Sequence, residues 1–286
     1  MATHRIRDLA FRHGAKPNLG FEIFRLRDLF DRADRGVLDH ALDVPQRLQF
    51  HSIYVGIRGK GKHVVDFTPV PLGAGHLTFV AAGRVQSFIV DRKVDAWALL
   101  FTPERVPPSP VLSPTWSVPV LALEDAAPFV ALVDQLAAEH ARSIDAHQPA
   151  ILDGLLRVFL LHAERLLGTA APPAALERFF TILERDHART RSVEHYAKAS
   201  GISKRRLGEL LGERTGKSTK QVVDERVILE CKRLLAHTEI SIKELAAQLA
   251  FDEPTNLVKF FRHHTGTTPQ AFRATQRTFL PSGRAS

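Results

Sequence analysis

Two short groups of mostly polar residues carry the side chains with the most evident chemistry in this chain. They are Lys204, Arg205, Arg206 and Glu209, followed about fifty positions later by Thr255, Asn256, Val258, Lys259 and Arg262. Arginine can hold guanine O6 and N7 with two hydrogen bonds, asparagine can pair with adenine, and glutamate can accept from cytosine N4. Valine can contact a thymine methyl group, and lysine and arginine also bind phosphates. A merely solvated surface is the alternative use of the same residues.

Both groups lie within a pattern that is written twice in residues 192–273. At an offset of 49 and then 50 residues, positions in the first copy meet similar residues in the second. The matched pairs are Val193 with Ile242, Tyr196 with Leu245, Ala197 with Ala246, Leu207 with Leu257, Leu210 with Phe260, Leu211 with Phe261, Gly216 with Gly266, Ser218 with Thr268 and Val222 with Phe272. Internal similarity at a fixed period indicates one structural unit used twice.

Each copy is expected to form two short helices joined by a break of about four residues. Ser203 and Asp252 are the expected N-caps of the second helices, and Ser241 with Glu244 makes a capping box at the start of the second copy. The stretch 221–236 predicts a helix of about 24 Å between the copies. Such a pair of helices is the unit that places its second helix in a DNA major groove. A small helical bundle with a duplicated hairpin is the alternative.

Three stretches carry a family resemblance: VILECKRLL at 227–235, SIKELA at 241–246 and AFDEPTNLVKFFRHHTGTTPQAFR at 250–273. Together they closely resemble the signature of AraC-type transcription regulators. Ala250 stands where that family usually has glycine, Leu257 where it often has an aromatic residue, and Cys231 where alanine is common. The resemblance implies a homodimer that binds double-stranded promoter DNA in successive major-groove segments, and in many relatives a contact with RNA polymerase.

Composition limits the classes of function. The 286 residues suffice for two domains, and of the net charge of +8, +7 belongs to residues 175–286, as an electrostatic footprint on DNA requires. No apolar run is long enough for a membrane span and no secretory signal is evident, so we expect a cytoplasmic protein without membrane contact. The single cysteine, Cys231, excludes a disulfide framework and is expected to be a buried structural thiol.

Residues 20–104 alternate short apolar runs with glycine turns, which favours a small barrel or sandwich of short strands. This segment resembles the cupin-type sensor domain that precedes many AraC-type repeats. Gln46, Leu48, Ser52 and Gln86 occupy the positions at which metal-binding cupins carry histidines and a carboxylate. We therefore expect no metal and no other cofactor.

A barrel without metal can still hold an organic ligand. The nearest polar or aromatic candidates are Arg47, Gln49, His51, Arg58, Gln86 and Trp97. An arginine that faces inward would favour an anionic effector, because an unpaired buried charge is costly. A filled core without a cavity is the alternative.

The expected fold class is α+β, with an N-terminal cupin-like β-barrel, a helical linker and a C-terminal all-α domain of two helix-turn-helix units. The expected domains are residues 1–106 for effector sensing, 107–174 for a proline-rich connector and linker, and 175–286 for DNA binding. Helices are expected at about 124–142 and 148–167, and the broad apolar face of the second could pack on the barrel or on a second chain.

These observations favour a DNA-binding transcription regulator controlled by a small molecule. A regulator without an effector, and a cupin enzyme with a helical accessory domain, are the alternatives. No nucleophile triad, phosphate-binding loop or dinucleotide fingerprint is present in the sequence, so no catalytic residue is assigned.

Overall fold

The computed structural model describes residues 7–11, 19–38, 42–88, 93–107, 109–112, 120–168 and 173–279. Parts of the predicted connectors at 107–114 and 168–175 lie outside the described residues. The chain divides into two compact units, residues 7–171 and a unit that contains residues 172–286. The α+β class is confirmed, since the first unit is rich in strands and the second is helical.

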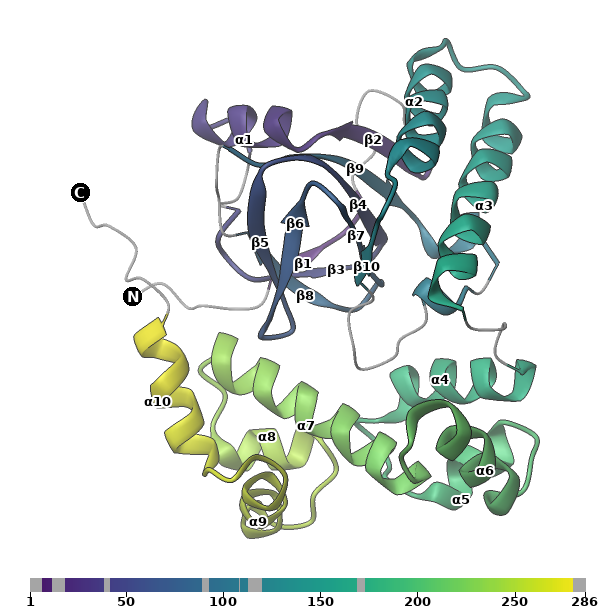
Figure 1. Ribbon diagram of the computed structural model, residues 1–286. Helices are drawn as coiled ribbons and strands as arrows, with labels where there is room; N and C mark the ends of the chain where they lie inside the picture. The colour runs from purple at the N-terminus through teal and green to yellow at the C-terminus, as the bar shows by residue number, and fades with distance from the viewer. Residues whose placement is uncertain are drawn as a thin grey trace. The chain divides into compact units, whose positions relative to one another are not determined.

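Two five-stranded sheets form a barrel in the first unit (Figure 1). The first sheet has the order β1(Arg7–Leu9), β3(Gln46–Leu48), β8(Val85–Phe88), β5(Lys60–Val65) and β6(Thr68–Gly73). The second sheet has the order β10(Val120–Ala122), β7(His76–Val80), β4(His51–Arg58), β9(Asp95–Phe101) and β2(Phe21–Arg25). Proline is tolerated in β6 because β6 is an edge strand.

The second sheet is buried on both of its faces. Its residues Tyr54, Ala96 and Ala98 belong to the core inside the barrel. The alternate residues, such as Ile53 and Leu99, pack in another core with two helices, α2(Ala127–Ala141) and α3(Gln148–Leu167). Both helices match the predicted helical stretches, and the apolar face of α3 packs internally through its buried residues.

One helix of the barrel unit was not predicted. It is α1(Leu26–Asp34), which follows β2 directly and buries Leu26 and Phe30 in the core inside the barrel. Two short 3-10 helices, η1(Pro103–Arg105) and η2(Pro110–Leu112), follow β9.

The second unit is entirely helical in its described part. Its helices are α4(Ala174–Asp186), α5(Val193–Ala199), α6(Lys204–Thr215), α7(Thr219–His237), α8(Ile242–Gln248), α9(Pro254–Thr265) and α10(Pro269–Phe279). The duplication is confirmed, because α5 and α8 each have 7 residues and α6 and α9 each have 12. Gly216 and Gly266 end α6 and α9 in the left-handed conformation, with φ of +68° and +73°.

The helix caps confirm most of the sequence predictions. The Ser203 hydroxyl accepts from the Arg206 N–H, and Ser241 and Glu244 form the predicted capping box. The prediction of Asp252 as an N-cap was wrong by one residue, since Glu253 precedes α9 and provides no side-chain cap. Pro254 explains the difference, because proline is favoured in the first turn of a helix and thereby sets its start.

Candidate functional site

The first helix-turn-helix unit consists of α5 and α6. Leu207, Leu210 and Leu211 bury one side of α6, so the opposite side is left to solvent. The predicted residues on that opposite side are all exposed: Lys204, Arg205, Arg206 and Glu209. The geometry therefore places the four together on one accessible surface of one helix.

Carboxylates already pair with each cation of this surface. Arg205 Nε and Arg206 Nη1 each lie 3.2 Å from a carboxylate oxygen of Glu209. Lys204 Nζ lies 2.7 Å from Oε2 of Glu194, which belongs to α5. These pairs are exposed, and exposed ion pairs contribute little to stability. They nevertheless compete with any anion for the same three cations.

The second helix-turn-helix unit consists of α8 and α9. The charge of its exposed surface differs from that of the first helix-turn-helix unit. Leu257 and Phe261 are buried, whereas Thr255, Asn256, Lys259 and Arg262 are exposed and Val258 is half-buried. Among the described residues, no carboxylate pairs with Lys259 or Arg262. The two cations of α9 are therefore available to an anion without breaking an ion pair.

Sequence reasoning missed two exposed histidines of α9, His263 and His264. His263 is exposed and lies four residues after Lys259, so the two share one stretch of the helix surface. That spacing was the available signal. A shallow hollow beside them is lined by both residues and by Ser218 and Gln221 at the start of α7.

Helix α7 joins the two units and is held by a buried ionic network. Its 19 residues correspond to about 28 Å, at about 1.5 Å per residue. Arg226 contacts Glu184 of α4 and Glu230 of α7, and Glu230 also lies 3.3 Å from Arg233. Figure 1 shows α7 running between the part that contains α5 and α6 and the part that contains α8 and α9.

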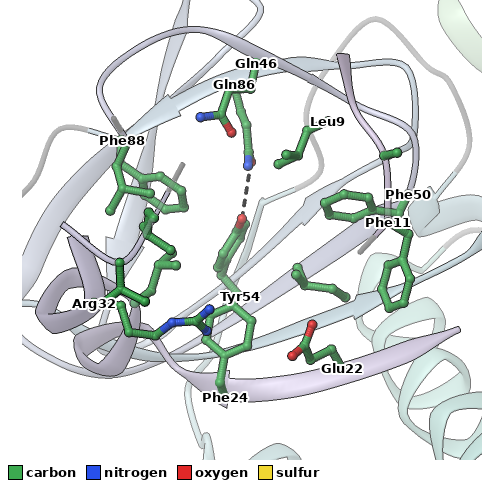
Figure 2. Close-up of a pocket in the computed structure, with 16 residues that line it drawn as sticks. Leu9, Phe11, Glu22, Phe24, Arg32, Gln46, Phe50, Tyr54, Gln86 and Phe88 are labelled. Carbon is green, nitrogen blue, oxygen red and sulfur yellow. Dashed lines mark hydrogen bonds between the residues drawn. The ribbon is translucent and has the colours of Figure 1, made fainter. Parts of the chain in front are cut away.

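The barrel contains a cavity of about 330 Å³ that is open on one side (Figure 2). That volume lies at the lower end of the range for small-molecule sites. Most of the lining is apolar, and aromatic rings contribute much of it: Leu9, Ala10, Phe11, Phe24, Leu29, Val37, Leu38, Leu42, Phe50, Phe88 and Leu100. The remaining lining residues are Glu22, Arg32, Gln46, Tyr54 and Gln86.

The polar groups of the cavity lie on two sides of it. Figure 2 shows Gln46 and Gln86 on one side, Glu22 and Arg32 on the other, and Tyr54 between them. The Tyr54 hydroxyl donates to Gln86 Oε1 at 3.2 Å, and burial raises the pKa of Tyr54 to about 12. Tyr54 is therefore a neutral hydrogen-bonding group at physiological pH. Arg32 is an exposed residue of α1 that reaches the cavity.

A buried histidine, His63, packs behind Tyr54 and Phe88, which line the cavity. The His63 ring is stacked on Phe88 with 4.6 Å between ring centroids, and it meets the edge of Tyr54 at 5.1 Å. Burial lowers the pKa of His63 to about 3, so the ring is neutral. It acts here as an aromatic packing residue behind two residues that line the cavity.

Of the six residues predicted to bind an effector, only Gln86 lines this cavity. Arg47 alternates with Gln46 and Leu48, which face inward, and therefore lies on the other side of β3. Gln49 and Arg58 are exposed.

His51 and Trp97 lie on the helix-covered face of the second sheet. The His51 ring lies 5.5 Å from that of Phe101, and Trp97 packs against the same core. His51 Nδ1 accepts from the Ala82 N–H, and burial lowers the pKa of His51 to about 4. Both residues serve packing between sheet and helices.

The four residues that were expected at the ligand positions of metal-binding cupins are all buried. They are Gln46, Leu48, Ser52 and Gln86. Within the described residues, no three His, Cys, Asp or Glu side chains lie close enough together to hold a metal ion. In the same part of the chain, no helix combines the length and apolarity that a bilayer crossing needs.

Comparison with known proteins gives a family match within the C-terminal helical unit. The family described as a helix-turn-helix domain matches residues 196–275. The HTH-type transcriptional activator RhaR of Escherichia coli O139:H28 is 21% identical over 270 residues, which cover 87% of this chain and 95% of RhaR. The solved DNA-binding domain of AdpA in complex with a target DNA is 29% identical over 38% of this chain and 98% of its own, with a TM-score of 0.35. ToxT from Vibrio cholerae O395 is 11% identical over 93% of this chain and 99% of its own, with a TM-score of 0.43.

Proposed function

We propose that this chain, which is an AraC-type DNA-binding transcription regulator, reads promoter DNA with both of its helix-turn-helix units and responds to a small organic molecule in its barrel. The observation that carries the DNA-reading part is the matched pair of helices α6 and α9. Each has 12 residues, each ends at a glycine of positive φ, and each exposes a polar side opposite a buried one. Two such helices suit two successive major-groove segments, about 34 Å apart.

The two units differ in how they would bind. In α9, Asn256 suits adenine, Val258 suits a thymine methyl group, and Lys259 and Arg262 reach an anion without losing a partner. In α6, DNA must first compete with Glu194 and Glu209 for the cations. We therefore assign the larger share of affinity to α9, and to α6 a share that depends on the ion pairs of Glu209.

Site selection from a random DNA pool by the full chain tests this function. Arg205→Ala and Asn256→Ala are expected to relax base preference at different positions of the selected site, about one turn apart, by about 1–3 kcal/mol each. Arg262→Ala is expected to weaken binding to all sequences alike. With about six phosphates neutralised, log affinity should fall against log salt concentration with a slope near −5. A flat salt response and an unselected pool would contradict DNA reading.

Glu209→Gln separates two roles of the first unit. If Glu209 accepts from a cytosine, the variant loses preference at that base pair. If Glu209 only neutralises Arg205 and Arg206, the variant binds all DNA more tightly and with a steeper salt slope, because two cations are released. The same selection and titration distinguish the outcomes.

For the effector, the cavity supports a compact molecule with an apolar body and an anionic group. Phe24, Phe50 and Phe88 offer the apolar wall, and Tyr54 and Gln86 offer hydrogen bonds. Arg32 offers the charge, in place of the outward-facing Arg47 and the exposed Arg58.

We also propose a homodimer formed through α3. Ile151, Val158 and Leu161 are 43%, 42% and 45% exposed, although their type is normally buried. With Gly154 they follow the 3-4-3 spacing of a helix-pair seam, and glycine permits close approach of a second helix. We further propose that the chain activates transcription through a contact with RNA polymerase. The family resemblance and the name of RhaR, a transcriptional activator, support this part of the proposal.

A further inference from the structure

Arg191 joins the entrance of the first helix-turn-helix unit to the turn inside the second. It directly precedes Ser192, the N-cap of α5. Its Nη1 donates to the carbonyl oxygens of Leu249 at 3.0 Å and of Ala250 at 3.3 Å. Its guanidinium carbon also lies 3.8 Å from the ring centroid of Phe251. One side chain thus contacts three consecutive residues that lie 58 to 60 positions away.

This turn of the second unit has two features that a guanidinium stabilises. Leu249 is the C-cap of α8, and the carbonyls at the end of a helix lack partners within it and carry partial negative charge. Ala250 has a φ of +52°, a left-handed conformation that costs a residue with a Cβ atom about 1–2 kcal/mol. The corresponding turn of the first unit uses Gly201, with a φ of +74°, and avoids that cost.

The first unit receives its arginine from a different place. The carbonyl of Ser200, the C-cap of α5, accepts from Arg178 Nε at 3.1 Å and from Arg178 Nη2 at 3.0 Å. Arg178 belongs to α4, the helix that precedes this unit and packs on it. The position 49 residues after Arg178 is Val227 in α7, a buried apolar residue. The turn of the second helix-turn-helix unit is therefore bound by Arg191, which lies at the start of the first helix-turn-helix unit.

We infer that Arg191 is a positioning residue that fixes the second reading helix relative to the first, and so sets the spacing at which the two units bind DNA. The inference rests on the proposed reading of DNA by both units. Helix α7 packs on helices of both units and is one connection between them. Arg191 is a second connection, and Phe251 precedes the start of α9 by only three residues. Holding that turn therefore holds the start of the reading helix.

The test uses the full chain and a DNA site that the unmodified chain selects from a random pool. The two halves of the site are then moved apart or together by one base pair. Arg191→Met keeps the length of the side chain but removes its donors, and is expected to bind the native spacing about tenfold more weakly, a change of about 1.4 kcal/mol. Its discrimination between the native and altered spacings should largely disappear, and Arg191→Lys should keep part of it. Arg189→Met is the matched control, because Arg189 is exposed in the same segment.

A second variant separates positioning from simple stabilisation. Ala250→Gly added to Arg191→Met removes the left-handed strain and should recover stability without restoring the spacing preference. Full recovery of that preference in the double variant would make Arg191 a stabilising residue only, and an unchanged preference in Arg191→Met would overturn the inference. If the unmodified chain itself tolerates every spacing, it is the two-unit reading of DNA that fails.

Discussion

Arg226 of α7 donates hydrogen bonds from two nitrogen atoms to Glu184 of α4. Its Nε donates to both carboxylate oxygens at 2.9 and 3.0 Å, and its Nη2 donates to Oε2 at 2.9 Å. Burial opposes the ionisation of Glu184, but the charge and hydrogen bonds of Arg226 outweigh it and lower the pKa of that carboxyl group. The pair ties the helix that precedes the first unit to the helix that joins both units.

Arg226→Met is expected to lower the free energy of unfolding of the C-terminal helical domain by about 3 kcal/mol, because Arg226 and Glu230 are buried and Glu230 loses this partner, as does the partly exposed Glu184. Denaturant unfolding followed by circular dichroism measures the change. Lys217→Met is the matched control: Lys217 forms an ion pair with Glu225 that is more than one third exposed on both sides, and its loss should change stability by less than about 1 kcal/mol. Equal effects of the two variants would contradict the structural importance of the buried pair.

Acid should weaken the contact between α4 and α5. Asp186 accepts from Arg185 and from His195 Nε2, each at 2.7 Å. The hydrogen bonds from Arg185, and then that from His195, lower the pKa of Asp186 although its burial acts in the opposite direction. The folded-state pKa is thus below the unfolded value of about 3.9. The stabilisation is complete above that value and is lost as the pH falls from about 4 toward the lower folded-state pKa.

Asp186→Asn is therefore expected to be less stable than the unmodified chain near pH 6 and to lose less stability between pH 5 and pH 3. Denaturant midpoints measured at each pH provide the test. Parallel pH curves for the two proteins would show that Asp186 does not carry this dependence.

The left-handed conformation of Ala250 should lower stability, and the labelling rate of the single cysteine, Cys231, can measure that effect. Cys231 is buried, and burial raises the pKa of its thiol to about 12. A thiol reagent can therefore label Cys231 only when the second helix-turn-helix unit opens. Ala250→Gly removes the steric cost but adds unfolded-state entropy, and the net stabilisation of about 0.5–1 kcal/mol should slow labelling about two- to fivefold. Gly201→Ala introduces the same strain in the first unit and should lower its stability. Faster labelling of Ala250→Gly would contradict the strain argument.

The helix-turn-helix units could be predicted closely from the sequence because their signals are local. Serine caps and glycine stops fix the ends of α6, and the repeat fixes the second unit by analogy with the first. The error at Asp252 arose where two acidic residues precede Pro254, so the cap type alone could not decide between them. Arg191 was beyond prediction, since its partners lie at least 58 positions away.

The barrel was predictable as a set of strands, but the direction of its side chains was not. Alternation identifies the inner side of a sheet only when the other side faces water. Here β4 and β9 are buried on both faces, so His51 and Trp97 gave no sign that they face the helices. Helix α1 was missed although Leu26, Leu29, Phe30 and Ala33 have helical spacing, because β2 runs into it without a break.

The proposed dimer predicts a clear change in mass. Val158→Lys with Leu161→Lys places two charges in the exposed stripe of α3, and the resulting repulsion and desolvation should convert a dimer into a monomer. Sedimentation velocity of the full chain measures the change. Leu166→Lys is the control, because Leu166 is also exposed but lies outside the stripe. A monomeric unmodified chain would remove the dimer from the proposal.

Arg32 should decide which small molecules the barrel accepts. The two tryptophans of the sequence stand at positions 97 and 116, before the C-terminal helical unit begins, so tryptophan fluorescence reports melting without a signal from that unit. Benzoate and hexanoate are expected to raise the melting midpoint by mass action, whereas benzamide and hexanamide, which lack the charge, should raise it less.

Arg32→Gln should remove the advantage of the acids over the amides, because the Arg32 guanidinium lines the cavity and can hold a carboxylate with two bonds. Arg35→Gln is the matched control, since Arg35 lies just beyond the same helix and donates to the Asp31 carbonyl oxygen instead. Tyr54→Phe should weaken acids and amides alike, because Tyr54 offers a hydrogen bond and no charge. Midpoint shifts that are equal for acids and amides in the unmodified chain would refute the anionic effector, and the absence of any shift would favour a regulator that uses no effector of this kind.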